Sequence, residues 1–77
     1  MNLIRGVAMT VSYNKLWKIL IDRNINKTQM RLMAGISTNV LAKMGRNETI
    51  SMDSLCKIAE ALHCGLDDIV EISSTKK

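Results

Sequence analysis

The segment AGISTNVLAKMGRNE, residues 34–48, concentrates side chains that can recognise another molecule through hydrogen bonds. Thr38 and Asn39 stand together, and Lys43 follows Asn39 at the spacing of one helical turn. An Asn amide can form paired hydrogen bonds with adenine, a Lys amine can reach the acceptors of guanine, and Thr offers a hydroxyl and a methyl group. Together these three residue types are suited to reading base edges in a double helix.

Four neighbouring residues have side chains suited to binding anions. Lys27 and Arg46 are cationic, Ser37 and Asn47 can donate hydrogen bonds, and Ser37 precedes an expected helix start, where backbone amides attract anions. Contacts of this kind to phosphates set the orientation and much of the affinity of a DNA-binding protein without selecting sequence. Each residue alone is as well explained by a solvated surface or a helix cap, so the prediction depends on their joint arrangement.

Two short helices must hold these side chains, and the local sequence contains their boundaries. The first begins near Lys27, and Gly35 is suited to the left-handed position after it. The second is expected over Thr38–Met44, with Gly45 ending it. Two capped helices joined by a Gly-containing turn predict a helix-turn-helix, whose second helix fits the DNA major groove. The capping residues expected here and at the next helix are Asn26, Gln29, Ser37 and Ser51.

The spacing of apolar residues predicts the remaining elements. Apolar side chains recur at helical spacing over residues 13–23, where Ser12 can cap, and again over residues 52–62. The segment LDDIVEI predicts a short fifth helix, because acidic residues in a first turn interact favourably with the helix dipole. The predicted fold class is therefore all-α, a five-helix bundle over residues 12–72. Residues 1–11 are predicted to be a flexible arm and residues 73–77 a flexible tail.

Charge and hydropathy narrow the range of functions. Residues 1–50 contain eight Lys and Arg against two acidic residues, whereas residues 51–77 contain three against five. This asymmetry suits a protein that presents one basic face to a polyanion. No apolar run approaches the ~20 residues of a membrane span, and the first ten residues lack the pattern of a secretory signal. We therefore expect a cytoplasmic protein without a membrane partner.

The chain offers few residues for catalysis or metal binding. His63 is the only histidine, no Ser or Cys has a general base nearby in the sequence, and no glycine-rich phosphate loop follows a strand. A zinc site of Cys56, His63 and Cys64 would lack a CxxC pair and a fourth ligand, so both cysteines are interpreted as buried thiols in a reducing compartment. We expect no enzymatic activity, cofactor, metal ion or small-molecule ligand.

From Asn26 to Val70 the sequence resembles the Cro/C1-type helix-turn-helix family, also called the XRE family. The resemblance rests on NKTQM, AGIS, TNVLAKM and SMDSLCKIAEALHCGLDDIV, which match in one register over more than half of the chain. YNKLWKILIDRN and NKT are also similar to small stand-alone regulators of Gram-positive bacteria, such as the VanU type of vancomycin-resistance gene clusters. The resemblance implies a lambda-repressor-like five-helix fold and a transcriptional regulator that binds double-stranded operator DNA, usually as a dimer.

The resemblance also implies roles for individual positions. The family's base-reading positions fall on Thr38, Asn39 and Lys43, and its phosphate-contacting positions on Lys27, Arg46 and Asn47. Lys27 stands where Gln is usual, and Arg31 stands where a small Ala is usual. Many members join the first helix to the recognition helix by an Arg–Glu pair, whose positions are Leu20 and Gly45 here. The recognition helix is therefore expected to end early.

The sequence leaves alternatives open for the C-terminal apolar residues and for the kind of partner. Ile69, Val70 and Ile72 form either the surface of a homodimer, through the C-terminal helix, or a cap on the domain core. The bundle could also be a protein-interaction module that keeps the fold without binding DNA. The basic balance of residues 1–50 and the polar residues Thr38, Asn39 and Lys43 favour DNA over a protein partner.

Overall fold

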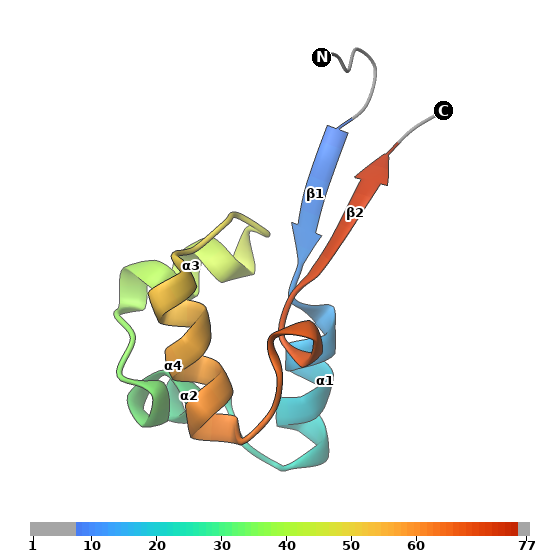
Figure 1. The fold of residues 1–77 in the computed structure, drawn as a ribbon. Helices are drawn as coiled ribbons and strands as arrows, with labels where there is room; N and C mark the ends of the chain where they lie inside the picture. Colours follow the sequence, from blue (N-terminus) through green and yellow to red (C-terminus); the bar gives the residue numbers. More distant parts are fainter. Residues whose placement is uncertain (1–7, 76–77) are drawn as a thin grey trace.

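The structure is a computed structural model that describes residues 8–75 of the 77-residue chain. In that range the elements are, in order, β1 (Ala8–Ser12), α1 (Asn14–Asp22), α2 (Lys27–Ala34), α3 (Thr38–Gly45), α4 (Met52–Leu62), the 3-10 helix η1 (Leu66–Asp68) and β2 (Glu71–Thr75). The helices form a bundle, and the two strands project from it together as a ribbon (Figure 1). The fold is therefore mostly helical, with a small sheet that the sequence did not lead us to expect.

The ribbon joins the two ends of the described chain. β1 and β2 are antiparallel, with Ala8 opposite Thr75 and Ser12 opposite Glu71. Residues 8–11 and 73–75, predicted as parts of a flexible arm and tail, are strands instead, because each supplies the other's backbone hydrogen bonds. The rest of the predicted arm and tail, residues 1–7 and 76–77, lies outside the described residues.

The predicted fifth helix is wrong beyond its first turn. Only Leu66–Asp68 is helical, as a 3-10 turn, and the chain then extends through Val70 into β2. The Gly65 backbone N–H donates to Asp68 Oδ2 at 3.1 Å, which closes this turn. An isolated seven-residue helix is marginal, and its last two residues, Glu71 and Ile72, pair with β1 instead.

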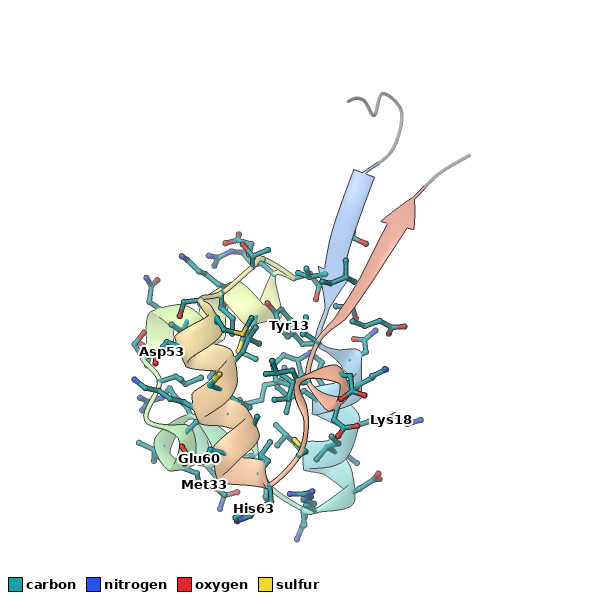
Figure 2. The ribbon with its side chains drawn as sticks, in the orientation of Figure 1. Tyr13, Lys18, Met33, Asp53, Glu60 and His63 are labelled. Carbon is teal, nitrogen blue, oxygen red and sulfur yellow. The ribbon has the colours of Figure 1, made fainter. Side chains whose placement is uncertain are left out.

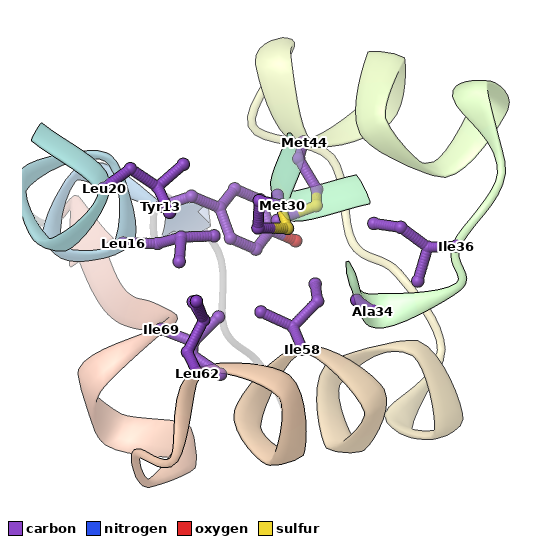
Figure 3. Close-up of a cluster of buried hydrophobic side chains, with 10 residues drawn as sticks. All are labelled: Tyr13, Leu16, Leu20, Met30, Ala34, Ile36, Met44, Ile58, Leu62 and Ile69. Carbon is purple, nitrogen blue, oxygen red and sulfur yellow. The ribbon is translucent and has the colours of Figure 1, made fainter. Parts of the chain in front are cut away.

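Apolar side chains from all four α-helices meet in one core (Figure 3). Ile69 is completely buried there, so it caps the core and cannot belong to the predicted dimer surface. Val70 is half-buried against the same core, whereas Ile72 is 63% exposed. The ten buried core residues are Tyr13, Leu16, Leu20, Met30, Ala34, Ile36, Met44, Ile58, Leu62 and Ile69.

Tyr13 lies where the ribbon joins the bundle (Figure 2). It was expected to begin the first helix, but α1 begins at Asn14, whose N–H donates to Ser12 Oγ at 3.2 Å. The buried Tyr13 hydroxyl donates to the Glu48 carbonyl at 2.6 Å, and burial raises the pKa of this phenol. One hydrogen bond thus ties the start of α1 to the connection between α3 and α4.

Two glycines provide a matched pair of substitutions with opposite expected effects. Gly35 has a left-handed φ of 72° and open space where a Cβ atom would stand, so only the backbone conformation opposes a side chain. We expect Gly35→Ala to destabilise the domain by about 1–2 kcal/mol. Gly45 lies in α3 with equally open space, so Gly45→Ala is expected to stabilise by up to about 1 kcal/mol. Urea unfolding measures both; losses of equal size would contradict this account.

Candidate nucleic-acid interface

α2 begins at a capping box and ends at a left-handed glycine. The Gln29 N–H donates to Asn26 Oδ1 at 2.7 Å, and the Asn26 N–H donates to Gln29 Oε1 at 2.9 Å. At the other end, Gly35 adopts a φ of 72° and its N–H donates to the Arg31 carbonyl at 2.9 Å. Local hydrogen bonds therefore fix both the length of α2 and the turn that leads to α3.

Arg31 occupies a position near the turn where a small residue was expected. Its side chain is half-buried, and Nη1 donates to the Ile36 carbonyl at 3.3 Å. Ile36 itself is buried in the core between α2 and α3. The long side chain is thus accommodated by hydrogen bonding to the turn, and the helix-turn-helix arrangement is retained.

Serine side chains cap the two helices that follow. The Val40 N–H donates to Ser37 Oγ at 3.2 Å at the start of α3, and the Ser54 N–H donates to Ser51 Oγ at 3.1 Å at the start of α4. Ser37 therefore uses its oxygen as an acceptor in the cap. Its hydroxyl hydrogen is the group that it can offer to a phosphate.

α3 directs apolar side chains into the domain and polar side chains outward. Met44 is completely buried, and Val40 and Leu41 are half-buried against the core. Thr38 and Asn39 are exposed, and so is Ala42, one turn further along the helix. The outer face therefore carries hydrogen-bonding groups beside a small methyl group, which allows a close approach to another surface.

α3 continues one residue beyond the predicted end. Gly45 is its last residue, and Arg46 follows as the cap, with its N–H donating to the Lys43 carbonyl at 3.0 Å. The expectation that Gly45 stops the helix is wrong. The residue with left-handed backbone is Asn47, at φ 56°, a conformation that Asn tolerates better than most residues.

Lys43 lies in the last turn of α3, one helical turn after Asn39. It is half-buried and lines an open groove between residues 10–12 of β1 and residues 46–49. Its positive charge is close enough to Glu48 to help lower the pKa of that carboxyl. The structure thus brings Lys43 together with Arg46 and Asn47 around one groove, and Thr38 and Asn39 are exposed in the first turn of the same helix.

Arg46 forms an ion pair with Glu48. Arg46 Nε donates to Glu48 Oε2 at 2.7 Å, and Nη2 lies 3.4 Å from Oε1. Both side chains are largely exposed, and the hydrogen bond from Arg46 is the main reason that the pKa of Glu48 is lowered. A phosphate that binds Arg46 must therefore compete with a carboxylate of the same chain.

The competition between Glu48 and a DNA phosphate for Arg46 can be tested by removing the carboxylate. We expect Glu48→Gln to raise affinity for all DNA sequences about two- to fivefold, because Arg46 becomes available and one negative charge is removed. Equilibrium titration of the variant with specific and random duplexes measures the effect. Asp53→Asn removes an exposed carboxylate from an ion pair with Lys57 on α4 and serves as the control. An unchanged or lower affinity in Glu48→Gln would show that Glu48 does not compete for Arg46.

Lys27 is the first residue of α2, and an aromatic ring fixes its amine. Nζ lies 4.2 Å from the centroid of the Trp17 ring on α1. A cation–π contact of this kind contributes about 0.5–1 kcal/mol at an exposed site. It holds a positive charge beside the backbone amides that begin α2, where an anion is favoured.

Comparison with known proteins decides the family. The family model described as the Cro/C1-type helix-turn-helix DNA-binding domain matches residues 15–74. The chain belongs to this family. A crystal structure of the transcriptional regulator VanUg is 45% identical, with a TM-score of 0.84 over 97% of this chain and 99% of that one. This match confirms the resemblance to VanU-type regulators. No curated protein matched the chain.

The Cro/C1-type domain contains three relevant residues that sequence reasoning missed. Ala42 could have been found from its spacing to Thr38, because residues four apart share a helical face. Trp17, which contacts Lys27, and Glu48, which pairs with Arg46, had no predicted role at this surface. The role of Trp17 depends on a contact between α1 and α2, for which the sequence contains no local signal. Glu48 is only two residues from Arg46, so their pairing could have been predicted from the sequence.

Cysteine and histidine do not form a second site in the described part of the domain. Cys56 is exposed and Cys64 half-buried, so the expectation of two buried thiols is wrong. Burial raises the pKa of the Cys64 thiol, and the nearby Asp68 carboxylate adds to the rise. His63 lies at the end of the bundle away from the ribbon (Figure 2). Within residues 8–75 no cluster could hold a metal ion, and no helix is long and apolar enough to cross a membrane.

Proposed function

We propose that this Cro/C1-type domain is a sequence-specific transcriptional regulator that binds double-stranded DNA and reads the major groove with α3. The observation that carries the proposal is the orientation of α3. Met44 anchors the helix in the core, while Thr38 and Asn39 present hydrogen-bonding groups to solvent at its capped start. These residue types recognise base edges, and the groove is wide enough for one helix.

Phosphate binding is proposed for the residues that flank α3. Lys27 stands at the start of α2, and Arg46 and Asn47 follow α3, so positive and donor groups lie before and after the recognition helix. Ser37 adds a hydroxyl at the cap. Contacts on both sides of a groove fix the register of the helix and supply affinity that depends on salt. The similarity to the regulator VanUg supports a role in transcription.

We further propose that the domain binds an operator as a dimer. One eight-residue recognition helix contacts few base pairs, and two copies on half-sites one helical turn apart add their contacts. Of the apolar residues first considered for this surface, Ile72 alone is well exposed. The exposure of Ile72 therefore favours β2 over the predicted C-terminal helix as part of the proposed dimer surface.

Selection of bound duplexes from random DNA tests the proposed function. We expect recovery of a two-fold symmetric site, with affinity that falls steeply between 50 and 200 mM salt because counterions are released. Circular dichroism on the same preparation confirms that the protein is folded. Absence of binding at low salt by folded protein would overturn the proposal and leave a protein-interaction module as the function of the fold.

Two lysines distinguish base reading from phosphate contact. Lys27→Ala is expected to weaken binding to all sequences about equally and to reduce the salt slope by about one. Lys43→Ala is expected to cost about 1–3 kcal/mol on the selected site and much less on other sequences. Titration of both variants on selected and scrambled duplexes measures this difference. Equal losses on both duplexes for Lys43→Ala would make Lys43 a phosphate contact.

A further inference from the structure

The loop that follows α3 carries two of the proposed phosphate contacts, Arg46 and Asn47, and its backbone is bonded to the end of that helix. The N–H groups of Arg46 and Glu48 donate to the Lys43 carbonyl at 3.0 and 2.9 Å. The Asn47 N–H donates to the Met44 carbonyl at 3.1 Å. All three bonds run back to the last turn of α3, so they fix the turn by which the loop leaves this helix.

Tyr13 reaches the same loop from a distant part of the sequence. Its hydroxyl donates to the Glu48 carbonyl at 2.6 Å, across a separation of 35 residues. Its ring extends from the start of α1 into the core, where the residue is only 1% exposed (Figure 3). Its own carbonyl accepts from the Trp17 N–H at 3.0 Å. Because a tyrosine side chain has only two rotatable torsions, the buried ring holds the Glu48 carbonyl at a fixed distance from α1.

The bond from Tyr13 goes to the backbone of Glu48 and is independent of the Glu48 side chain. The Glu48 carboxylate accepts from Arg46 Nε at 2.7 Å, so one residue connects the tyrosine hydroxyl to the arginine. Burial raises the pKa of the Tyr13 phenol above its ordinary value of about 10, so the hydroxyl keeps its proton and donates at neutral pH. Tyr13 thus acts on the conformation of the loop without touching the groups that the loop presents to solvent.

We propose that Tyr13 is a positioning residue for DNA binding, whose hydroxyl holds the loop in the conformation in which Arg46 and Asn47 contact phosphates. A loop that must be ordered on binding costs free energy, and a loop that is already held costs less. The gain applies to every DNA sequence, because phosphate contacts carry no sequence information. Tyr13 is buried and does not itself contact DNA. The inference rests on the proposed function, because the position of this loop affects affinity only if the domain binds DNA.

Tyr13→Phe removes the hydroxyl and keeps the buried ring. We expect the dissociation constants for selected and scrambled duplexes to rise by similar factors of about three to ten. Ile58→Val shortens a fully buried side chain in the middle of α4 and serves as a control for lost stability. With the folded fraction known from urea unfolding, its affinity for DNA should stay within about twofold of wild type. Equal losses in the two variants, or no loss in Tyr13→Phe, would overturn the proposal.

A double-mutant cycle shows whether Tyr13 acts through the loop. In an Arg46→Ala background, Tyr13→Phe is expected to cost at most about twofold in affinity, because the main group that it positions is gone. In a Lys27→Ala background the full loss of about three- to tenfold is expected, because Lys27 begins α2 and its amine is held by Trp17. The same loss in both backgrounds would mean that Tyr13 supports the whole domain rather than this loop, and would contradict the proposed role.

Hydrogen exchange of the full chain without DNA separates the two proposals. The Glu48 amide, which donates to the Lys43 carbonyl, is expected to exchange at least about fivefold faster in Tyr13→Phe than in Ile58→Val. Equal exchange in the two variants would show that the hydroxyl does not hold the loop. Wild-type protein that shows this difference but binds no DNA would overturn the proposed function and, with it, the role of Tyr13 in binding. Wild-type protein that binds DNA while the losses in the cycle are additive would overturn the role of Tyr13 alone.

Discussion

Met44→Ala is expected to lower the free energy of unfolding by about 2–5 kcal/mol, which is the usual cost of removing a large buried side chain. Met44 is completely buried and anchors α3 beside Met30 in the core (Figure 3). A domain of this size is stable by roughly 4–12 kcal/mol, so the variant loses a large part of its stability. Because α3 is the proposed recognition helix, DNA binding is expected to fall with the folded fraction.

Met52 provides a matched control for this prediction. It is the first residue of α4 and is 60% exposed, so Met52→Ala should change the free energy of unfolding by no more than about 0.5 kcal/mol. Urea unfolding of the wild type and both variants, followed by circular dichroism, measures the difference. A Met44→Ala variant as stable as Met52→Ala would show that α3 is not held by its buried methionine.

Asn39→Ala is expected to weaken binding to the selected DNA site by about 1–3 kcal/mol while binding to scrambled DNA changes little. Asn39 is exposed at the start of α3, and its amide can both donate to and accept from an adenine edge. The loss is expected to be concentrated at one base pair of each half-site. Titration of the variant against sites substituted at each position identifies that base pair.

Asn14 supplies the control for Asn39. It is an exposed asparagine on α1, outside the helix-turn-helix unit, and its side chain is not part of that helix's cap. Asn14→Ala should bind the selected and scrambled duplexes as the wild type does. If Asn39→Ala lost affinity equally on both duplexes, Asn39 would contact the DNA backbone, and sequence reading would have to come from other residues of α3.

The capped helices were predictable because their boundaries are encoded locally. Asn26, Ser37 and Ser51 each accept a hydrogen bond from a backbone N–H three residues ahead, within a single turn. Such signals need no knowledge of the rest of the fold, and the bounds of α2 and α4 agree with the prediction. The end of α3 was predicted one residue too early, because Asn47 rather than Gly45 adopts the left-handed backbone.

The ribbon could not be predicted in the same way. β1 and β2 are separated by almost the whole chain, and their five-residue sequences contain no turn or strong alternation that links them. The prediction of a helix over LDDIVEI was ambiguous, because the spacing of apolar residues in so short a segment is compatible with both a helix and a strand. The burial of Ile69 and the pairing partner of β2 decide between the two, and both are tertiary contacts.

The candidate site likewise contains features that local sequence predicts and features that it does not. The residue types on α3 and their outward direction follow from helical spacing, so Thr38 and Asn39 were predictable as exposed residues. The surroundings of Lys43 and Lys27 could not be predicted, because Lys43 lies in a groove beside β1 and Lys27 lies over the indole ring of Trp17 on α1. Arg46 is paired with Glu48, which is only two residues away. These arrangements determine how readily each cation is available to a phosphate.

The contact between Lys27 and Trp17 gives the domain its own optical probe. Trp17 is the only tryptophan of the chain, and the Lys27 amine lies 4.2 Å from the centre of its ring. Indole emission responds to a nearby charge, so a phosphate that draws the amine away alters the fluorescence of one known residue. Arrival of the DNA backbone at the start of α2 can therefore be followed in real time, without a label and apart from events at α3.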